Sequence, residues 1–136
     1  MALPGVIVVA MVSASGCSVQ HQTRAVKESQ VIIDGNRFSA GAPTCRQQQM
    51  YRSIDISTAS SHIEAVVLLK ADTAIPQWVK IHDFGGFTGS FWNSGVGDAH
   101  ASIAQQRFTI TGNAYGINNN DPNKVITTDF TIVAEC

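Results

Sequence analysis

Charged residues are scarce in this chain of 136 residues. Only 14% of the residues are Asp, Glu, Lys or Arg, and the formal net charge is -1. The nine Lys and Arg residues are scattered singly along the chain, whereas a nucleic-acid interface needs them clustered. We therefore expect no nucleic-acid partner. No heptad repeat is present either, which argues against a coiled coil.

A hydrophobic run long enough to span a membrane is also missing. The longest apolar segment, Leu3 to Val12, has about ten residues, whereas a spanning helix needs about 20. That length is typical of the apolar core of a secretory signal peptide. The positive charge that usually precedes such a core is absent from Met1 to Pro4. A start codon assigned too far downstream would explain its absence.

Cys17 follows this segment in the run Ala14-Ser15-Gly16-Cys17. A bacterial lipoprotein signal peptidase requires small residues there, because its groove accepts an extended backbone only when the flanking side chains are tiny. The pattern predicts a signal peptide over residues 1–16 and acylation of Cys17. Two or three acyl chains would then hold the protein firmly at the membrane. The alternative is an ordinary buried N-terminal strand with an incidental cysteine.

The other two cysteines, Cys45 and Cys136, lie far downstream. If Cys17 is acylated, an even number of thiols remains, and an exported protein is expected to pair them in an oxidising compartment. We therefore predict a disulfide between Cys45 and Cys136. It would close a loop of about 90 residues and contribute roughly 4 to 5 kcal/mol to stability. Two unrelated buried thiols are the alternative.

Residues 31–136 have the pattern of a β domain, whereas residues 17–30 are polar, without apolar periodicity, as is typical of a tether. Val31 to Ile33 runs into Asp34-Gly35-Asn36, which predicts a tight hairpin turn. Elsewhere, period-two alternation between turn-forming residues predicts strands. The strands expected in this way lie over 53–57, 62–71, 77–84, 87–92, 108–117 and 126–136, with a turn at 72–76 and a connection at 118–123.

The expected architecture follows from these strands. Both faces of 62–71 are apolar, so a central strand is expected there, with a short helix as the alternative. Gly85-Gly86 predicts a corner before 87–92, and the closely spaced Gly89, Gly95 and Gly97 predict a bend or bulge. With about eight or nine strands and no helix, the chain is predicted to be all-β, an antiparallel meander forming a sandwich or a partly closed barrel with one disulfide.

Several segments occur in an order that resembles a known family. They are Val31-Ile32-Ile33-Asp34-Gly35, Cys45, Ile63-Glu64-Ala65-Val66-Val67-Leu68, Gly85 to Gly97, Phe108-Thr109-Ile110-Thr111-Gly112 and Phe130-Thr131-Ile132-Val133-Ala134-Glu135-Cys136. Through them the chain resembles the mycobacterial nineteen-kilodalton lipoprotein antigen family over residues 31–136.

The resemblance implies a cell-envelope lipoprotein that is acylated at Cys17 and anchored to the cell membrane with its domain facing outside. It further implies that host pattern-recognition receptors sense the acyl group. The family's cysteine pair maps onto Cys45 and Cys136. One feature departs from the best-known member, whose long tether is glycosylated. Here the tether is short, and its hydroxyl side chains are those of Ser18, Thr23 and Ser29.

No constellation typical of an enzyme is present in the sequence. The histidines lie on separate segments without metal-ligand spacing: His21, His62, His82 and His100. Sheet pairing could bring His82 and His100 together, but histidines on polar strand faces are the simpler interpretation. There is no Gly-x-Ser-x-Gly elbow, and Asp121 lacks the spaced carboxylates of a calcium loop. We predict no catalytic residue, no metal and no cofactor.

Four aromatic residues, Phe84, Phe87, Phe91 and Trp92, are concentrated in one segment. Because adjacent strand residues face opposite ways, Phe91 and Trp92 cannot both enter the same core. One of them would then line a groove or face solvent, unless both sheet faces are covered or a glycine bulge turns both inward. A second possible function is therefore lipid or glycolipid binding at these four residues. An envelope enzyme is a third, and it would require polar side chains converging in a cleft.

Overall fold

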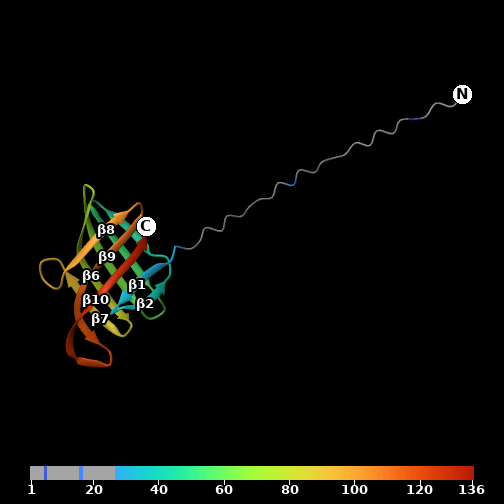
Figure 1. Cartoon of the computed structure of the whole chain (residues 1–136). Coiled ribbons are helices and arrows are strands. Elements are labelled where there is room, and N and C mark those ends of the chain that lie inside the picture. The colour runs from blue at the N-terminus through green and yellow to red at the C-terminus, as the bar shows by residue number, and fades with distance from the viewer. Residues whose placement is uncertain (1–4, 6–15, 17–26) are drawn as a thin grey trace.

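A computed structural model describes residues 5, 16 and 27–136, so Cys17, His21 and most of the predicted tether lie outside the described residues. Every regular element in this part of the chain is a β-strand, which confirms the all-β prediction (Figure 1). The strands are β1 (Ser29–Ile33), β2 (Asn36–Ala40), β3 (Thr44–Gln48), β4 (Tyr51–Ser57), β5 (His62–Lys70), β6 (Thr73–Phe84), β7 (Phe87–Trp92), β8 (Ala99–Ala104), β9 (Arg107–Asn118) and β10 (Asp121–Glu135). The described residues include no helix that could cross a membrane.

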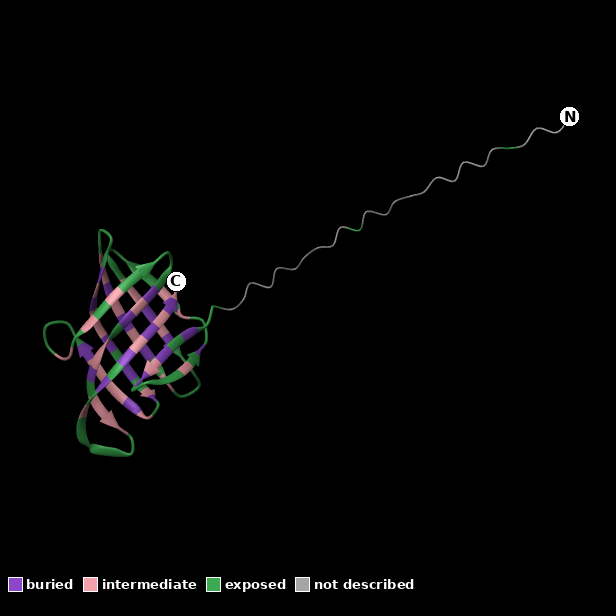
Figure 2. Cartoon of the chain, viewed as in Figure 1, coloured by how far each residue is buried: buried purple, intermediate pink, exposed green. Residues whose placement is uncertain are grey.

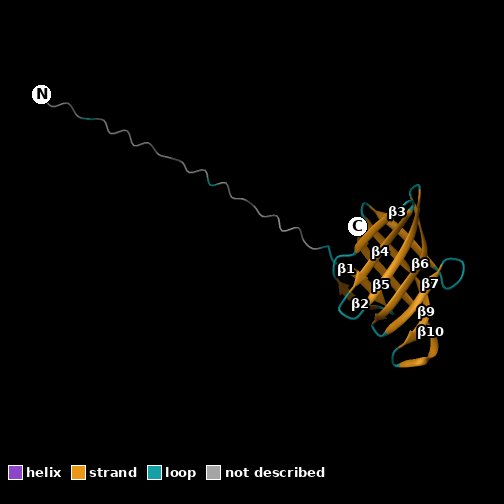
Figure 3. Cartoon of the chain, turned by 180° about the vertical axis from the view of Figure 1, so that it is seen from behind, coloured by secondary structure: helices purple, strands orange, loops and turns teal. Residues whose placement is uncertain are grey.

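All the strands belong to one antiparallel sheet. Its order is β2-β1-β10-β9-β7-β6-β5-β4-β3, and the first half of β9 also pairs with β8. The sheet is open, with β2 and β3 at its ends. However, buried side chains from strands along the whole sheet form a single hydrophobic cluster. One face of the sheet can meet itself in this way only if the sheet rolls up, and Figures 1 and 3 show its strands crossing over one another. This arrangement is nearer to the predicted partly closed barrel than to a sandwich of two sheets.

The alternation of side chains along β10 shows how the sequence directs this rolling. Phe130, Ile132 and Ala134 are buried, whereas Asp129 is exposed and Thr131 is only partly buried. Figure 2 shows the same alternation along the neighbouring strands. Burial of each large apolar side chain contributes roughly 1.5 to 3 kcal/mol, so the inward face is strongly specified. A one-residue slip would turn the whole inner set outward.

The hairpin between β1 and β2 has the predicted turn. Asp34 and Gly35 both have positive φ values, 49° and 79°, as a type I′ turn requires. Asp and Gly adopt this conformation at low cost. The central strand predicted over 62–71 is also confirmed, because β5 runs from His62 to Lys70.

Two facing glycines allow β7 and β9 to approach closely. Gly89 of β7 pairs with Gly116 of β9. A methyl group on Gly116 would overlap the backbone oxygen of Thr88, and one on Gly89 would overlap the ring of Phe87. The Phe87 ring therefore covers Gly89 and fills the space that a side chain there would occupy. Sequence analysis predicted a bend or bulge at Gly89, Gly95 and Gly97. The β6–β7 register shifts before this segment, between Ile81 and Phe84 of β6.

The disulfide joins two distant parts of the rolled sheet. Cys45 lies on β3, the strand at one end of the sheet. Cys136 directly follows β10, which is the third strand from the other end, after β2 and β1. The two residues are 91 positions apart in the chain, with their Cα atoms 5.8 Å apart. Both pack against the hydrophobic cluster. The predicted pairing is confirmed, and the bond bridges the seam at which the sheet does not close by hydrogen bonding.

Some predicted strand bounds differ from the structure. The turn predicted over 72–76 is shorter in the structure, because it occupies Ala71 and Asp72 and β6 begins at Thr73. Pro76 lies inside β6, where its missing N–H is tolerated because the β5–β6 register shifts between Val66 and Val67. The connection predicted over 118–123 is also shorter, because β10 begins at Asp121.

The remaining differences concern strands and ends that carry little hydrophobic signal. β1 begins at Ser29, slightly before the predicted start of the domain at residue 31. β3 and β8 were not among the predicted strands. Most of their residues are exposed or only partly buried, so neither has the clear alternation on which the prediction depends.

Candidate functional site

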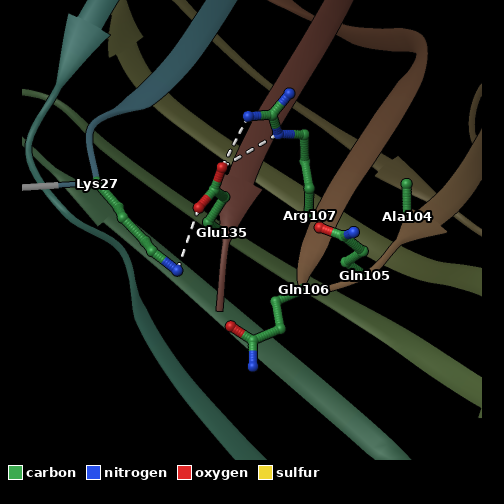
Figure 4. Close-up of a pocket in the computed structure, with 6 residues that line it drawn as sticks. All are labelled: Lys27, Ala104, Gln105, Gln106, Arg107 and Glu135. Carbon is green, nitrogen blue, oxygen red and sulfur yellow. Dashed lines mark hydrogen bonds and ion pairs between the residues drawn. The ribbon is translucent and has the colours of Figure 1, made fainter. Parts of the chain in front are cut away.

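A surface pocket of about 590 Å³ lies at the end of the sheet where Lys27 leads into β1 (Figure 4). Its walls come from the residues just before β1, the β8–β9 turn and the end of β10. The lining residues are Lys27, Ala104, Gln105, Gln106, Arg107 and Glu135. Two cations, one carboxylate and two amides suit a polar or charged group. They do not suit an acyl chain, which requires mainly apolar walls.

Glu135 connects the two cations of this pocket, as the dashed lines of Figure 4 show. Its Oε1 accepts hydrogen bonds from Arg107 Nη2 at 2.7 Å and from Arg107 Nε at 3.3 Å. Its Oε2 lies 3.2 Å from Lys27 Nζ. The Arg107 guanidinium, and after it the Lys27 ammonium, lower the pKa of the Glu135 carboxyl below its ordinary value of 4.5. Glu135 therefore stays ionised in mild acid.

These interactions fix the start of the folded domain to its C-terminal strand. Lys27 precedes β1, Glu135 ends β10, and the next residue, Cys136, donates its backbone N–H to Gln106 O at 2.9 Å. The ion pairs and the disulfide thus lie at the same end of the sheet. Sequence analysis missed this cluster, because its charges are single residues far apart in the chain and Lys27 lies in the predicted tether.

The four aromatic residues predicted to contact an apolar ligand are divided between the two faces of the sheet. Phe84, Phe87 and Phe91 belong to the buried cluster, whereas the Trp92 side chain is 43% exposed. The prediction that Phe91 and Trp92 face opposite ways is confirmed. Phe87 also forms part of the wall of a small pocket of about 110 Å³, which has room for only a few water molecules.

The described histidines form no metal site. His62 of β5 pairs with His82 of β6, and His62 Nε2 lies 3.4 Å from Asp55 Oδ1. His100 of β8 pairs instead with Thr111 of β9, so sheet pairing does not place His82 opposite His100. Over residues 27–136, no group of three or more His, Cys, Asp or Glu side chains is placed to hold a metal ion. Polar strand-face histidines therefore remain the simplest interpretation for these three.

Comparison with known proteins connects this fold to a family. The family model described as Mycobacterium 19 kDa lipoprotein antigen matches residues 22–136. The chain belongs to this family. The match covers all ten strands and both disulfide cysteines, and it begins earlier than the predicted resemblance, which began at residue 31.

Individual proteins are similar to this chain over nearly its whole length. A protein of Mycobacterium tuberculosis named as a probable lipoprotein, LppE, is 49% identical over 130 residues, which are 94% of this chain and 93% of the relative. A protein of Mycobacterium indicus pranii, also named as a lipoprotein, is 31% identical over 120 residues, or 88% and 86% of the two chains. A lipoprotein of Mycobacterium avium subsp. hominissuis is 29% identical over 133 residues, or 96% and 92%.

The family and these relatives are all named as lipoproteins, and the relatives are mycobacterial. These are names of lipoproteins and not of enzymes. The polar pocket, the disulfide and the exposed tryptophan are therefore features of a domain of this lipoprotein family.

Proposed function

We propose that this protein is a lipid-anchored lipoprotein that is cleaved before Cys17, acylated on Cys17 and displayed outside the cell membrane as an interaction and antigen protein. One observation carries the proposal. A domain of the lipoprotein antigen family follows directly after a cysteine that small residues precede. The signal peptide over 1–16 would be removed during maturation.

The position of Lys27 supports a membrane-proximal domain. The ten residues 17–26 can span at most about 35 Å, even when fully extended. The domain would therefore remain close to the bilayer, with Lys27, the polar pocket and the disulfide at the end of the sheet nearer to the anchor. The β1–β2, β6–β7 and β9–β10 turns lie at the opposite end and would be presented away from the membrane.

Cell fractionation tests the anchor. The wild-type chain and a Cys17→Ser variant are expressed in a bacterium that matures lipoproteins, and membranes are washed with high salt. We expect the wild-type protein to stay in the membrane fraction and the variant to appear in the soluble fraction. A Ser18→Ala variant serves as the matched control and should stay in the membrane fraction. Equal membrane retention of the wild-type and Cys17→Ser proteins would refute the anchor.

Sensing by host receptors would depend on the acyl group rather than on the sheet. Reporter cells that carry a pattern-recognition receptor for bacterial lipoproteins are exposed to the acylated protein and to the Cys17→Ser protein. Only the acylated form should activate the receptor. Equal activation by both proteins would assign recognition to the polypeptide instead.

Lipid or glycolipid carriage remains a separate proposal, and the packing of the domain gives it little support. Three of its four predicted contacts, Phe84, Phe87 and Phe91, are core residues, so a ligand would have to displace them. Native mass spectrometry of the Cys17→Ser protein, isolated from the host, tests this function. A bound lipid of defined mass would support a carrier, and an unliganded mass would remove this proposal.

A further inference from the structure

Two tryptophans stack on the outer face of the sheet. Trp78 of β6 is directly opposite Trp92 of β7 in the sheet register. Their ring centroids are 6.1 Å apart, and the ring planes differ by 29°. The core does not need either ring, because the inward positions of these strands are already occupied by Val79 and Phe91, which are buried. A large aromatic surface is therefore left facing solvent.

Lys80 lies over both indole rings. Its Nζ is 4.8 Å from the Trp78 ring centroid and 5.6 Å from that of Trp92, which is within the range of a cation–π interaction. In the sheet register Lys80 is opposite Glu64 of β5. Although both residues are described, no ion pair joins them, because the ammonium is directed to the indoles. The Glu64 carboxylate is therefore left available to accept hydrogen bonds. We call Trp78, Trp92, Lys80 and Glu64 the indole platform.

Polar and aromatic side chains extend the indole platform along the sheet. Lys80 is opposite Ser90 of β7, and Ser90 is opposite Tyr115 of β9. Tyr115 is 47% exposed. Residues opposite or diagonal to one another on one face of a sheet lie within about 8 Å. Ring faces, a hydroxyl, an ammonium and a carboxylate thus lie together on one side of the sheet.

The chemistry of the indole platform excludes several classes of ligand. A quaternary ammonium ligand would be repelled by the Lys80 ammonium, which lies over the same rings, whereas a neutral ligand would not. An apolar protein partner would have to remove Lys80 and Glu64 from water, which costs free energy unless both find new partners. A nucleic acid would require more basic residues than Lys80 alone.

A sugar fits these side chains better than the other classes. The C–H bonds of one pyranose face can lie against the electron-rich face of an indole. The hydroxyl groups at the edge of the same ring can accept a hydrogen bond from Lys80 and donate one to Glu64. We propose that the indole platform binds a pyranose unit of an oligosaccharide. The source that fits the proposed anchoring is a glycan of the cell's own envelope, close to which the short tether would hold the domain, but binding itself requires no acyl group.

Intrinsic fluorescence offers a specific test, because Trp78 and Trp92 are the two tryptophans of the whole chain. The full chain carrying Cys17→Ser is titrated with maltohexaose, cellohexaose and mannohexaose, and with phosphocholine as the cationic comparison. We expect a saturable change in tryptophan emission with at least one hexasaccharide and none with phosphocholine. A Trp92→Ala variant should bind that hexasaccharide roughly tenfold more weakly, as expected for the loss of one aromatic stacking contact.

Matched variants keep the result interpretable. Trp92→Phe retains a ring face and should keep most of the affinity. It therefore keeps the test usable if Trp92→Ala fails to fold. Tyr51→Ala removes another exposed aromatic residue, on β4, two strands away from Trp78, and should leave binding unchanged. The proposal is overturned if no hexasaccharide changes the emission. It is also overturned if Trp92→Ala binds as tightly as the parent, or if phosphocholine binds instead.

Discussion

Removal of the Cys45–Cys136 disulfide should cost the domain a large part of its stability. The two cysteines are 91 positions apart, and the bond removes the corresponding freedom from the unfolded chain. The chain-entropy relation gives about 15.6 cal/mol/K for a loop of this length, which is about 4.6 kcal/mol at 25 °C. Since small domains are stable by about 5 to 15 kcal/mol in total, about 30% or more of the free energy of unfolding depends on one bond.

The measurement compares two proteins in urea. Both carry Cys17→Ser, and one also carries Cys45→Ser and Cys136→Ser, so the proteins differ only at the bridge. Unfolding is followed by tryptophan fluorescence. We expect a decrease of about 4 to 5 kcal/mol in the free energy of unfolding, and a melting temperature lower by about 20 °C for a domain of this size.

The location of the bond predicts which strands respond first. Hydrogen exchange of the reduced protein should increase most in β3, at the end of the sheet, and least in β9, which has neighbours on both sides. This comparison remains informative if the double-serine variant does not fold. A stability change below about 1 kcal/mol, or uniform exchange in all strands, would refute the view that the bond closes the seam.

Two further predictions concern single residues. Because Arg107 lowers the pKa of Glu135 in the folded state, stabilisation by this pair is present above pH 4.5 and is lost as the pH falls through the folded-state pKa. Urea unfolding is measured from pH 6 to pH 2.5, and the free energy of unfolding should fall less over this range in Glu135→Gln than in the parent protein. The same pH dependence in both proteins would contradict this. Gly116→Ala should destabilise the domain by about 1 to 3 kcal/mol through overlap with the Thr88 carbonyl. Gly41→Ala, where a methyl group meets nothing, should change stability little, and equal effects of the two substitutions would argue against a close approach of β7 and β9.

The sequence was most informative where local rules determine structure. Alternation of apolar and polar residues in β10, and the positive-φ preference at Asp34 and Gly35, were enough to predict a strand and a turn. The pairing of Cys45 with Cys136 followed from the number of cysteines left after Cys17. None of these predictions needed knowledge of which strands are neighbours.

Features that depend on strand order could not be predicted from one sequence. Strand alternation predicted that Phe91 and Trp92 face opposite ways, but only the β6–β7 register brings the Trp78 and Trp92 rings together. In the same way, Lys27 and Glu135 meet because β1 lies beside β10. Residues that bind at a surface carry no periodic hydrophobic signal, so the polar pocket and the indole platform became visible only with the fold.

Acylation of Cys17 is the central claim, and the mass of the mature N-terminal peptide tests it most directly. The protein is purified from the membranes of a lipoprotein-maturing host, digested, and analysed by mass spectrometry. We predict a first peptide that begins at Cys17 and carries a diacylglycerol with or without an amide-linked fatty acid. A peptide with an unmodified Cys17, or one that still includes residues 1–16, would contradict the account.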